Sequence, residues 1–392
     1  MRFSRVSRGE LERRWALVRG LLDERGIDAL VTLCSDDDMG GYVRWLTDGG
    51  VLPYRRGVIF DRDGPMTVVE HGGIGQKRAT GGDDPDYPGI DLVLGTAEFP
   101  AVHYSLHYEA EIVVGEIRRR GWRKVALAGT GNMPHRFVGY LTDALGGAVE
   151  LPDLTEEIDA FMVVKSAEAI EHIRRAAALQ DRILEVVVAS ARPGMRDAEI
   201  TALARAEAQR HGAEGGIILA GSGPQGTFAP FRPISMQNRV IGKGDYLSIL
   251  VENSAPGGYF TEVARTLVFG KAGQQLGEAV AAATEMQQAI RKLFVPGTPC
   301  AEIFAAHNDE RRRRGLPPED RIFAHGQGYN LVERPLVRHD ETMTVKEGMN
   351  FAVHPTIADG RTVFAIMCDN YIVGAQGLGA CLHATPQRIF EI

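Results

Sequence analysis

The chain has 392 residues, and its 44 lysines and arginines against 51 aspartates and glutamates give a formal net charge of −7. Charges of both signs are mixed along the sequence, so the basic surface of a nucleic-acid-binding protein is not expected. At roughly 150 residues per domain, the length favours two domains. No apolar run has the length of a signal peptide or a membrane span, so we expect a cytoplasmic protein with no membrane partner.

The four cysteines, Cys34, Cys300, Cys368 and Cys381, lie far apart in the sequence. Their spacing resembles neither a zinc motif nor a disulfide framework. We therefore expect them to be reduced.

The first part of the chain has the pattern of an α/β domain. Apolar residues at helical spacing predict a helix over 11–25, ending at Gly26, and a second helix is expected over 110–120. Short apolar runs predict buried strands at 28–33, 57–60, 66–69, 91–94 and 124–128.

The second part begins near residues 151–154, which divides the chain into 1–155 and 156–392. Ser166 is a candidate N-cap for a long helix. Further helices are expected at 197–211, 278–293 and 300–314, and the remainder is rich in strands. The glycine-rich turn at 221–226 lacks the lysine and the strand-to-helix context of a phosphate-binding loop.

Four separated stretches carry the strongest signal. His325 stands between Ala324 and Gly326 in segment 323–335, and it is accompanied by segments 244–249, 258–267 and 347–355. In this order the stretches resemble the "pita-bread" family of methionine aminopeptidase, aminopeptidase P, prolidase and creatinase. The resemblance implies an α/β N-terminal creatinase-like domain, followed by an α+β pita-bread catalytic domain. It also implies a homodimer in which the N-terminal domain of one subunit closes the other subunit's site.

Metal-dependent members of that family hold two divalent ions with two Asp, one His and two Glu. Here Glu262 stands at the second Asp position and His325 at the His position, whereas the two Glu positions hold His354 and Cys368. The first Asp position falls on Leu250 or Val251, depending on the count, and Glu252 could substitute for it only if Leu250 is the right match. Without bridging carboxylates, a dinuclear centre is not expected.

We therefore favour a metal-independent hydrolase similar to creatinase or ectoine hydrolase, without a cofactor. Its substrate would be a small N-substituted amino acid, guanidino compound or amide, and a C–N bond would be cleaved. His325 would act as general acid and base, helped by Glu262 or Asp369, with His354 as a further catalytic candidate.

Two alternatives remain open. In the first, Glu262, His325 and His354 hold one divalent transition metal in a site of two histidines and one carboxylate. In the second, the domain is a non-catalytic binding module for a peptide or protein. Cys368 is more simply a small core residue than a nucleophile, since no neighbouring motif supplies a base.

Arginine and aromatic residues together would suit a small zwitterionic substrate, because the guanidinium group is a forked donor for carboxylates. The candidate substrate-binding residues are Tyr54, Arg55, Arg56, Phe231, Arg232, Glu333 and Arg334, with Arg338 as a further alternative.

Overall fold

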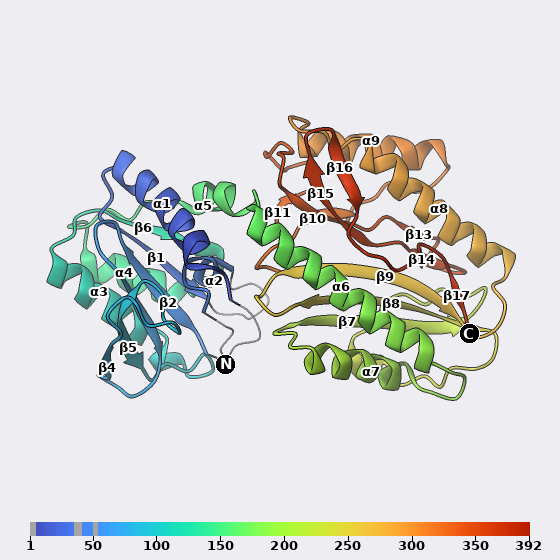
Figure 1. The fold of residues 1–392 in the computed structure, drawn as a ribbon, viewed down its shortest axis with the longest axis horizontal. Helices are drawn as coiled ribbons and strands as arrows, with labels where there is room; N and C mark the ends of the chain where they lie inside the picture. The colour runs from blue at the N-terminus through green and yellow to red at the C-terminus, as the bar shows by residue number, and fades with distance from the viewer. Residues whose placement is uncertain (1–4, 35–40, 50–53) are drawn as a thin grey trace. The chain divides into compact units, whose positions relative to one another are not determined.

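A computed structural model of the protein describes residues 5–34, 41–49 and 54–392. These residues form two compact units, Met1–Met162 and Val163–Ile392, drawn in Figure 1. The boundary expected after residue 155 coincides with the start of helix α5 (Thr155–Met162), and this helix belongs to the first unit. The first unit has one sheet and the second has three, and each unit has its own hydrophobic core.

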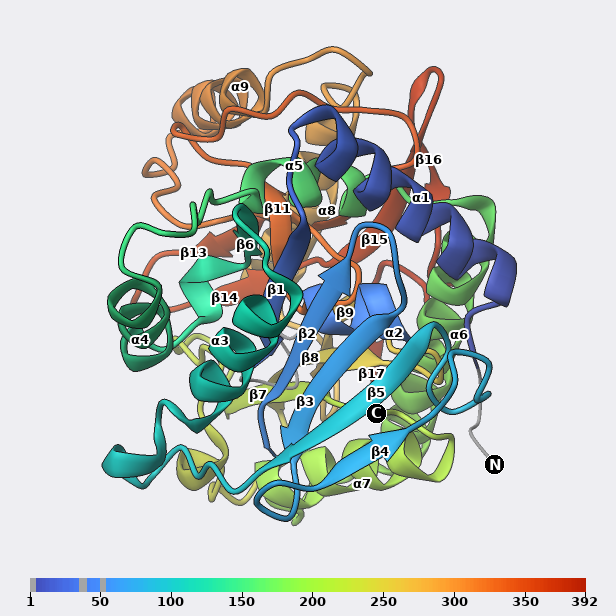
Figure 2. The same cartoon turned by 90° about the vertical axis from the view of Figure 1, so that its left-hand side faces the viewer.

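The first unit is built on one six-stranded sheet with the order β4-β5-β3-β2-β1-β6, which Figure 2 shows. Its strands are β1 (Ala29–Cys34), β2 (Arg56–Asp61), β3 (Met66–His71), β4 (Lys77–Ala79), β5 (Ile90–Thr96) and β6 (Val125–Ala128). Its other helices are α1 (Arg8–Glu24), α2 (Gly41–Thr47), α3 (Tyr108–Arg120) and α4 (His135–Leu145). The five strands expected from apolar runs are present. Strand β4 was not expected, because its three residues are exposed and carry no apolar signal.

Helix α1 shows why the local pattern predicted this region well. Ser7 caps the helix by accepting a hydrogen bond from the backbone N–H of Glu10 at 3.1 Å. Trp15 and Val18 are buried on the apolar stripe. The helix ends just before Gly26, whose φ of 61° is the left-handed conformation that glycine adopts at little cost.

The second unit contains four long helices and three sheets. The helices are α6 (Ala167–Ser190), α7 (Asp197–Arg210), α8 (Gln274–Arg291) and α9 (Cys300–Arg313). Ser166 caps α6 through the backbone N–H of Ala169, as predicted. A four-stranded sheet has the order β17-β9-β8-β7, a five-stranded sheet the order β11-β10-β12-β15-β16, and β13 pairs with β14. The strands are β7 (Gly216–Pro224), β8 (Asp245–Ser254), β9 (Phe260–Val268), β10 (Ala324–Gly326), β11 (Glu333–Leu336), β12 (Asn350–Val353), β13 (Thr356–Ala358), β14 (Phe364–Ile366), β15 (Asp369–Gly374), β16 (Gly377–Cys381) and β17 (Phe390–Glu391).

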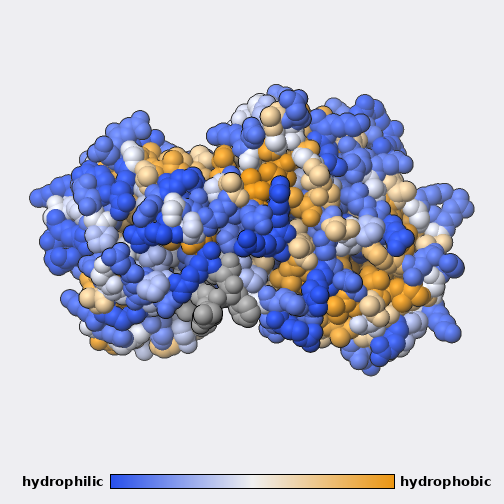
Figure 3. All heavy atoms as spheres, viewed as in Figure 1, coloured by the Kyte–Doolittle hydropathy of each residue, from blue (hydrophilic) through white to orange (hydrophobic). Residues whose placement is uncertain are grey.

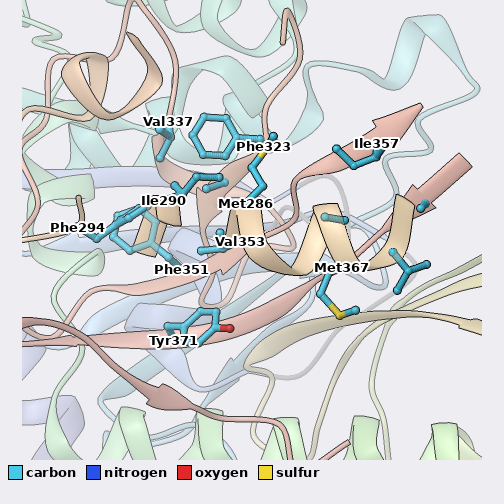
Figure 4. Close-up of a cluster of buried hydrophobic side chains, with 14 of the residues drawn as sticks. Met286, Ile290, Phe294, Phe323, Val337, Phe351, Val353, Ile357, Met367 and Tyr371 are labelled. Atoms are coloured by element: carbon cyan, nitrogen blue, oxygen red, sulfur yellow. The ribbon is translucent and has the colours of Figure 1, made fainter. Parts of the chain in front are cut away.

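A large apolar core lies between α8 and the five-stranded sheet. Figure 4 shows Met286 and Ile290 of α8 close to Phe351 and Val353 of β12 and to Phe323. All five side chains are buried. Burial of such a side chain stabilises a fold by about 1.5–3 kcal/mol, so this packing holds β12 firmly in place.

The four-stranded and five-stranded sheets are joined where β9 meets β15. Ala264 bridges Cys368, and next to them the Nη2 atom of Arg265 lies 2.6 Å from the Oδ1 atom of Asp369. Both side chains are fully buried. Arg265 also donates to four backbone carbonyl groups, and the other Asp369 oxygen accepts from Gln287 and Gln387. The ion pair, with every N–H of the guanidinium donating a hydrogen bond, joins one sheet to the other.

Hydrophilic side chains cover much of the face of the molecule in Figure 3, with apolar residues gathered in smaller patches. Within the described ranges, no helix combines the length and the apolar character needed to cross a bilayer.

A buried acidic pair lies in the first unit. Glu98 and Glu109 are 3% and 2% exposed, and Arg55 donates a hydrogen bond to Glu98. Burial, and then the neighbouring Glu98, raise the pKa of the Glu109 carboxyl to about 9, against a smaller opposing effect of Arg55. Glu109 therefore keeps its proton in the folded protein at neutral pH.

Replacing Asp369 by alanine is expected to lower the free energy of unfolding by about 3–5 kcal/mol, because the buried guanidinium of Arg265 loses its counter-charge. Urea denaturation of the variant measures this change. Asp309→Ala, which breaks the exposed pair with Arg312, should leave the unfolding midpoint nearly unchanged. An equally small effect for Asp369→Ala would contradict the structural importance of the buried pair.

Glu109→Gln is expected to flatten the pH dependence of stability. Between pH 4.5, the ordinary pKa of a glutamate, and pH about 9, folded Glu109 holds a proton that the unfolded chain releases. The free energy of unfolding of the unmodified protein should therefore fall as pH rises in this window, by up to about 1.4 kcal/mol per pH unit from this group. Glutamine removes that contribution. Urea denaturation at several pH values measures the slope, and Glu111→Gln on the same helix should keep it; a slope unchanged in Glu109→Gln would refute the assignment.

Candidate active site

Three potential metal ligands meet where the two joined sheets of the second unit come together. Glu262 lies on β9, His325 on β10, and His354 directly follows β12. His325 is opposite Ala352 in the antiparallel register of β10 and β12, which brings the two histidines close, with ring centroids 5.2 Å apart. One ligand atom from each of the three residues lies within 4.8 Å of the others. We call these three residues the Glu-His-His cluster.

The hydrogen bonds of His325 determine what its ring can do. Its Nδ1 atom lies 2.9 Å from the backbone oxygen of Gly326, a distance at which an N–H donates to that carbonyl group. In the tautomer with its proton on Nδ1, the ring carries a lone pair on Nε2, which lies 3.4 Å from the Oε2 atom of Glu262. That oxygen is buried, and it accepts no hydrogen bond from the part of the chain that the structure describes. Two lone pairs therefore face a common point, as the ligands of a cation do.

Burial and the neighbouring charges set the ionisation of the cluster. Burial lowers the pKa of His354 to about 4, although Glu262 acts in the opposite direction, so His354 is neutral at physiological pH. Burial opposes ionisation of Glu262, but His354 and His325 outweigh it and hold the pKa of its carboxyl below the ordinary value. The cluster thus offers one carboxylate and a neutral imidazole, the protonation states in which these groups bind metals.

The strand register shows where the two candidate positions for the first family aspartate lie. On β8, Glu252 is directly opposite Glu262, whereas Leu250 is opposite Ala264 and Val251 is opposite Val263. Side chains two apart share a face of a strand, so Glu252 faces the same side as Leu250. The Oε1 atom of Glu252 accepts a hydrogen bond of 2.6 Å from Gln327. It is not among the three residues whose ligand atoms converge.

The rest of this sheet face is apolar. Leu250, Ala264 and Cys368 form a cluster with Ala352, Phe364 and Ile366. Burial, and then Glu262 nearby, raise the pKa of the Cys368 thiol well above its ordinary value, so it is a poor nucleophile and a poor metal ligand. The donors here do not fit the family's dinuclear centre, because apolar groups and a thiol occupy positions where bridging carboxylates would be needed. They do fit a single ion held by the Glu-His-His cluster.

Asp369 does not join the cluster. Successive residues of a strand point to opposite faces, and Asp369 binds Arg265 on the side opposite Cys368. Its carboxylate is used in the ion pair between the sheets. The sequence could not distinguish this role from a catalytic one.

Most of the predicted substrate-binding arginines are already paired. Arg55 pairs with Glu98, Arg56 with Glu70 and Arg334 with Glu341. Glu333 binds Lys165, and Tyr54 stacks on His71 in the first unit. Arg338 pairs with Asp340 at the surface.

Arg232 is different. It is half-buried, and within residues 5–34, 41–49 and 54–392 its guanidinium makes no hydrogen bond or ion pair. Its neighbour Phe231 packs edge-to-face on Phe364 of the apolar cluster beside Cys368.

Two residues near the site were not anticipated from the sequence. Gln327 and Asn370 are fully buried and hydrogen-bonded to each other, and they contact Glu252 and the backbone of Glu262. The only sequence signal was their proximity to His325 and Cys368, because amides carry no recognisable catalytic spacing.

Curated relatives at the sequence level include a protein of Mycobacterium tuberculosis (strain ATCC 25618 / H37Rv), described as "Probable dipeptidase PepE". It is 27% identical over 243 residues, which is 60% of this chain and 62% of the mycobacterial protein. The match thus spans less than two thirds of that relative. A methionine aminopeptidase of Chlamydia trachomatis is 24% identical over 212 residues, 51% of this chain and 72% of the relative.

Solved structures of the same fold cover nearly the whole chain. The X-Pro aminopeptidase of Thermotoga maritima aligns with a TM-score of 0.77 at 17% identity, over 96% of this chain and 99% of that one. The dipeptidase PepE of Mycobacterium ulcerans aligns with a TM-score of 0.74 at 20% identity, over 99% of both chains. These similarities establish the two-domain pita-bread fold that the sequence motifs predicted.

The sequence model of metallopeptidase family M24 matches residues 171–377, more than half of the chain and all three members of the Glu-His-His cluster. The chain therefore belongs to metallopeptidase family M24.

Proposed function

We propose that the protein hydrolyses a C–N bond in a small, dipeptide-like N-substituted amino acid, using one divalent transition metal bound by Glu262, His325 and His354. The observation that carries the proposal is the convergence of three ligand atoms, from buried Glu262 and His325 and half-buried His354, within 4.8 Å of one another; among the described residues, the Oε2 atom of Glu262 accepts no hydrogen bond. Two histidines and one carboxylate suit Fe(II), Mn(II) or Zn(II). Two comparisons support this chemistry: the matched family is described as a metallopeptidase family, and the mycobacterial relative is described as a probable dipeptidase.

A bound ion at this position would supply Lewis-acid activation of water and of the scissile carbonyl group. The chain's own residues orient and isolate the reacting groups. The backbone oxygen of Gly326 holds the His325 ring so that Nε2 faces Glu262. The apolar cluster around Cys368 limits water on one side of the site, which strengthens electrostatic interactions there.

A metal-independent hydrolase, favoured from the sequence, is the second candidate. Its supporting observation is the 3.4 Å separation between the Nε2 atom of His325 and Glu262. If His325 carries the proton there instead, Glu262 would orient the ring and His325 would act as general acid and base. Asp369 would take no direct part in either reaction, because it is bound to Arg265.

We propose that Arg232 binds the carboxylate of the substrate. It is the member of the predicted arginine set whose guanidinium has no partner in the described part of the chain. Phe231, packed on Phe364, would place it beside the apolar cluster. The homodimer and the substrate-binding roles of Tyr54, Arg55 and Arg56 stay predictions.

Elemental analysis of protein purified without chelator, from cells grown with Mn, Fe, Co and Zn, should give about one ion per chain. His325→Ala and His354→Ala should each lose the ion and hydrolysis of dipeptides, because each removes one of three ligands. His307→Ala is the matched control, since it removes from α9 a buried imidazole that makes no hydrogen bond with any residue the structure describes.

The same experiment separates the two candidates. If metal-free protein hydrolyses the substrate and His325→Ala abolishes this activity, the metal proposal is overturned in favour of acid–base catalysis. An ion retained in both histidine variants would place the metal elsewhere.

Arg232→Ala is expected to raise KM for substrates with a free carboxylate by about 10–100-fold, because a charge-assisted hydrogen bond contributes about 1.5–3 kcal/mol. KM for the matching C-terminal amides should change little, and Arg232→Lys should recover part of the loss. Steady-state kinetics on acid and amide pairs measures this, with Arg338→Ala as a surface control. Equal effects on acids and amides would exclude the carboxylate role.

A further inference from the structure

Three buried carboxamides lie beside the Glu-His-His cluster. Gln327, Asn350 and Asn370 are 0%, 1% and 0% exposed. Gln327 comes two residues after His325, and Asn350 and Asn370 lie on β12 and β15 of the same sheet. Their amides are bonded to one another, so they form a continuous chain of hydrogen bonds.

The chain of hydrogen bonds begins at Glu262. The backbone N–H of Glu262 donates to the Oδ1 atom of Asn370 at 2.6 Å, and a ring nitrogen of His383 lies 3.4 Å from the same oxygen. The Nδ2 atom of Asn370 donates to Gln327 Oε1 at 2.8 Å and to Asn350 Oδ1 at 3.3 Å.

Gln327 continues the series of hydrogen bonds. Its Nε2 atom donates to Glu252 Oε1 at 2.6 Å and to the carbonyl group of Leu331 at 3.0 Å. Asn350 also donates to the backbone oxygen of Gln327 at 3.1 Å.

The orientation of each amide is fixed by the backbone. A backbone N–H can only donate, so Asn370 must present its oxygen to Glu262 and its NH2 group to Gln327. A backbone carbonyl group can only accept, so Gln327 must present its NH2 group to Leu331 and to Glu252. Neither amide can flip without leaving a buried donor opposite another donor, or an acceptor opposite an acceptor.

This series of hydrogen bonds links the strands that carry the Glu-His-His cluster. Glu262 is on β9 of one sheet, whereas Asn370 belongs to β15 of the other, and Gln327 follows the strand of His325. The backbone of Glu262 is therefore held by an amide of the sheet that carries the histidines. At the other end, the Gln327 amide satisfies Glu252, which stands directly opposite Glu262.

We propose that Asn370 and Gln327 are positioning residues that hold Glu262 in register with His325 and His354, through a directional amide relay ending on Glu252. The proposal rests on the proposed function of the Glu-His-His cluster. The relay consists of neutral groups, so it fixes the carboxylate without adding a charge that would compete for a cation. Buried polar networks act in this way only when every member is satisfied, as here.

Asn370→Asp tests the relay with almost no change in shape. The aspartate can still accept from the Glu262 N–H, but it cannot donate, so an oxygen would face the oxygens of Gln327 and Asn350. Two quantities are measured on the purified full chain: the ring nitrogen chemical shifts of His325 and His354 in metal-free protein, and the Kd for Zn²⁺ by calorimetric titration. We expect changed ring shifts and a 10–100-fold higher Kd, the usual effect of removing an outer contact of a metal site.

Asn308→Asp is the matched control. Asn308 is a buried amide of α9 whose contacts are the backbone N–H and carbonyl group of Glu319, outside the relay. It should leave both quantities unchanged. If Asn370→Asp also leaves both unchanged, the relay is refuted. If the unmodified protein binds no Zn²⁺ but Asn370→Asp still shifts the ring signals, the relay stands and the metal proposal falls.

Variants of Gln327 and Glu252 test the relay even if Asn370→Asp fails to fold. Gln327→Glu places a carboxylate against Glu252 and should disturb the ring signals, as should Glu252→Gln. Combined, the two substitutions restore one amide–carboxylate hydrogen bond in the reverse direction and should recover part of the unmodified ring shifts, because the carboxylate at position 327 still faces the carbonyl group of Leu331. If the ring shifts of the double variant change by the sum of the changes in the two single variants, the direction assigned to the relay is overturned.

Discussion

The second unit depends on the buried ion pair between Arg265 and Asp369. Each of the two joined sheets carries only part of the Glu-His-His cluster, so the cluster exists only if the sheets keep a fixed relation. Arg265 saturates its donors with Asp369 and with backbone carbonyl groups from both sides of the junction. A buried pair of this kind is costly to break, because either charge left alone would remain in a medium of low dielectric constant.

On the face opposite to this ion pair, the junction is divided into a polar half and an apolar half. Glu252, Glu262 and Asn370 are on one side, and Leu250, Ala264 and Cys368 on the other. The apolar half removes the donors for a second ion. It also keeps the Cys368 thiol protonated, while burial keeps His354 neutral. The same desolvation thus suits the site to one cation and makes cysteine chemistry unfavourable.

Neutral amides hold the two glutamates of the site in position. Glu252 and Glu262 stand opposite each other across β8 and β9, a placement that would be repulsive if both were ionised and unpaired. Gln327 supplies a donor to Glu252, and Asn370 supplies an acceptor to the backbone of Glu262. The geometry is therefore maintained by hydrogen bonds whose direction is fixed, and the carboxylate of Glu262 is left available to the two histidines.

The sequence by itself determined the two-domain fold, the main helices and strands and the positions of Glu262, His325 and His354, because capping residues, hydrophobic periods and motif order are local signals. It did not predict that Glu252 lies opposite Glu262, that Asp369 binds Arg265 or that Arg55 pairs with Glu98. Nor did it predict that the guanidinium of Arg232 makes no hydrogen bond or ion pair with the described residues. Those outcomes depend on strand register and on contacts between residues far apart in the chain. A shift of one residue in a strand moves a side chain to the opposite face, and only the tertiary structure fixes that choice.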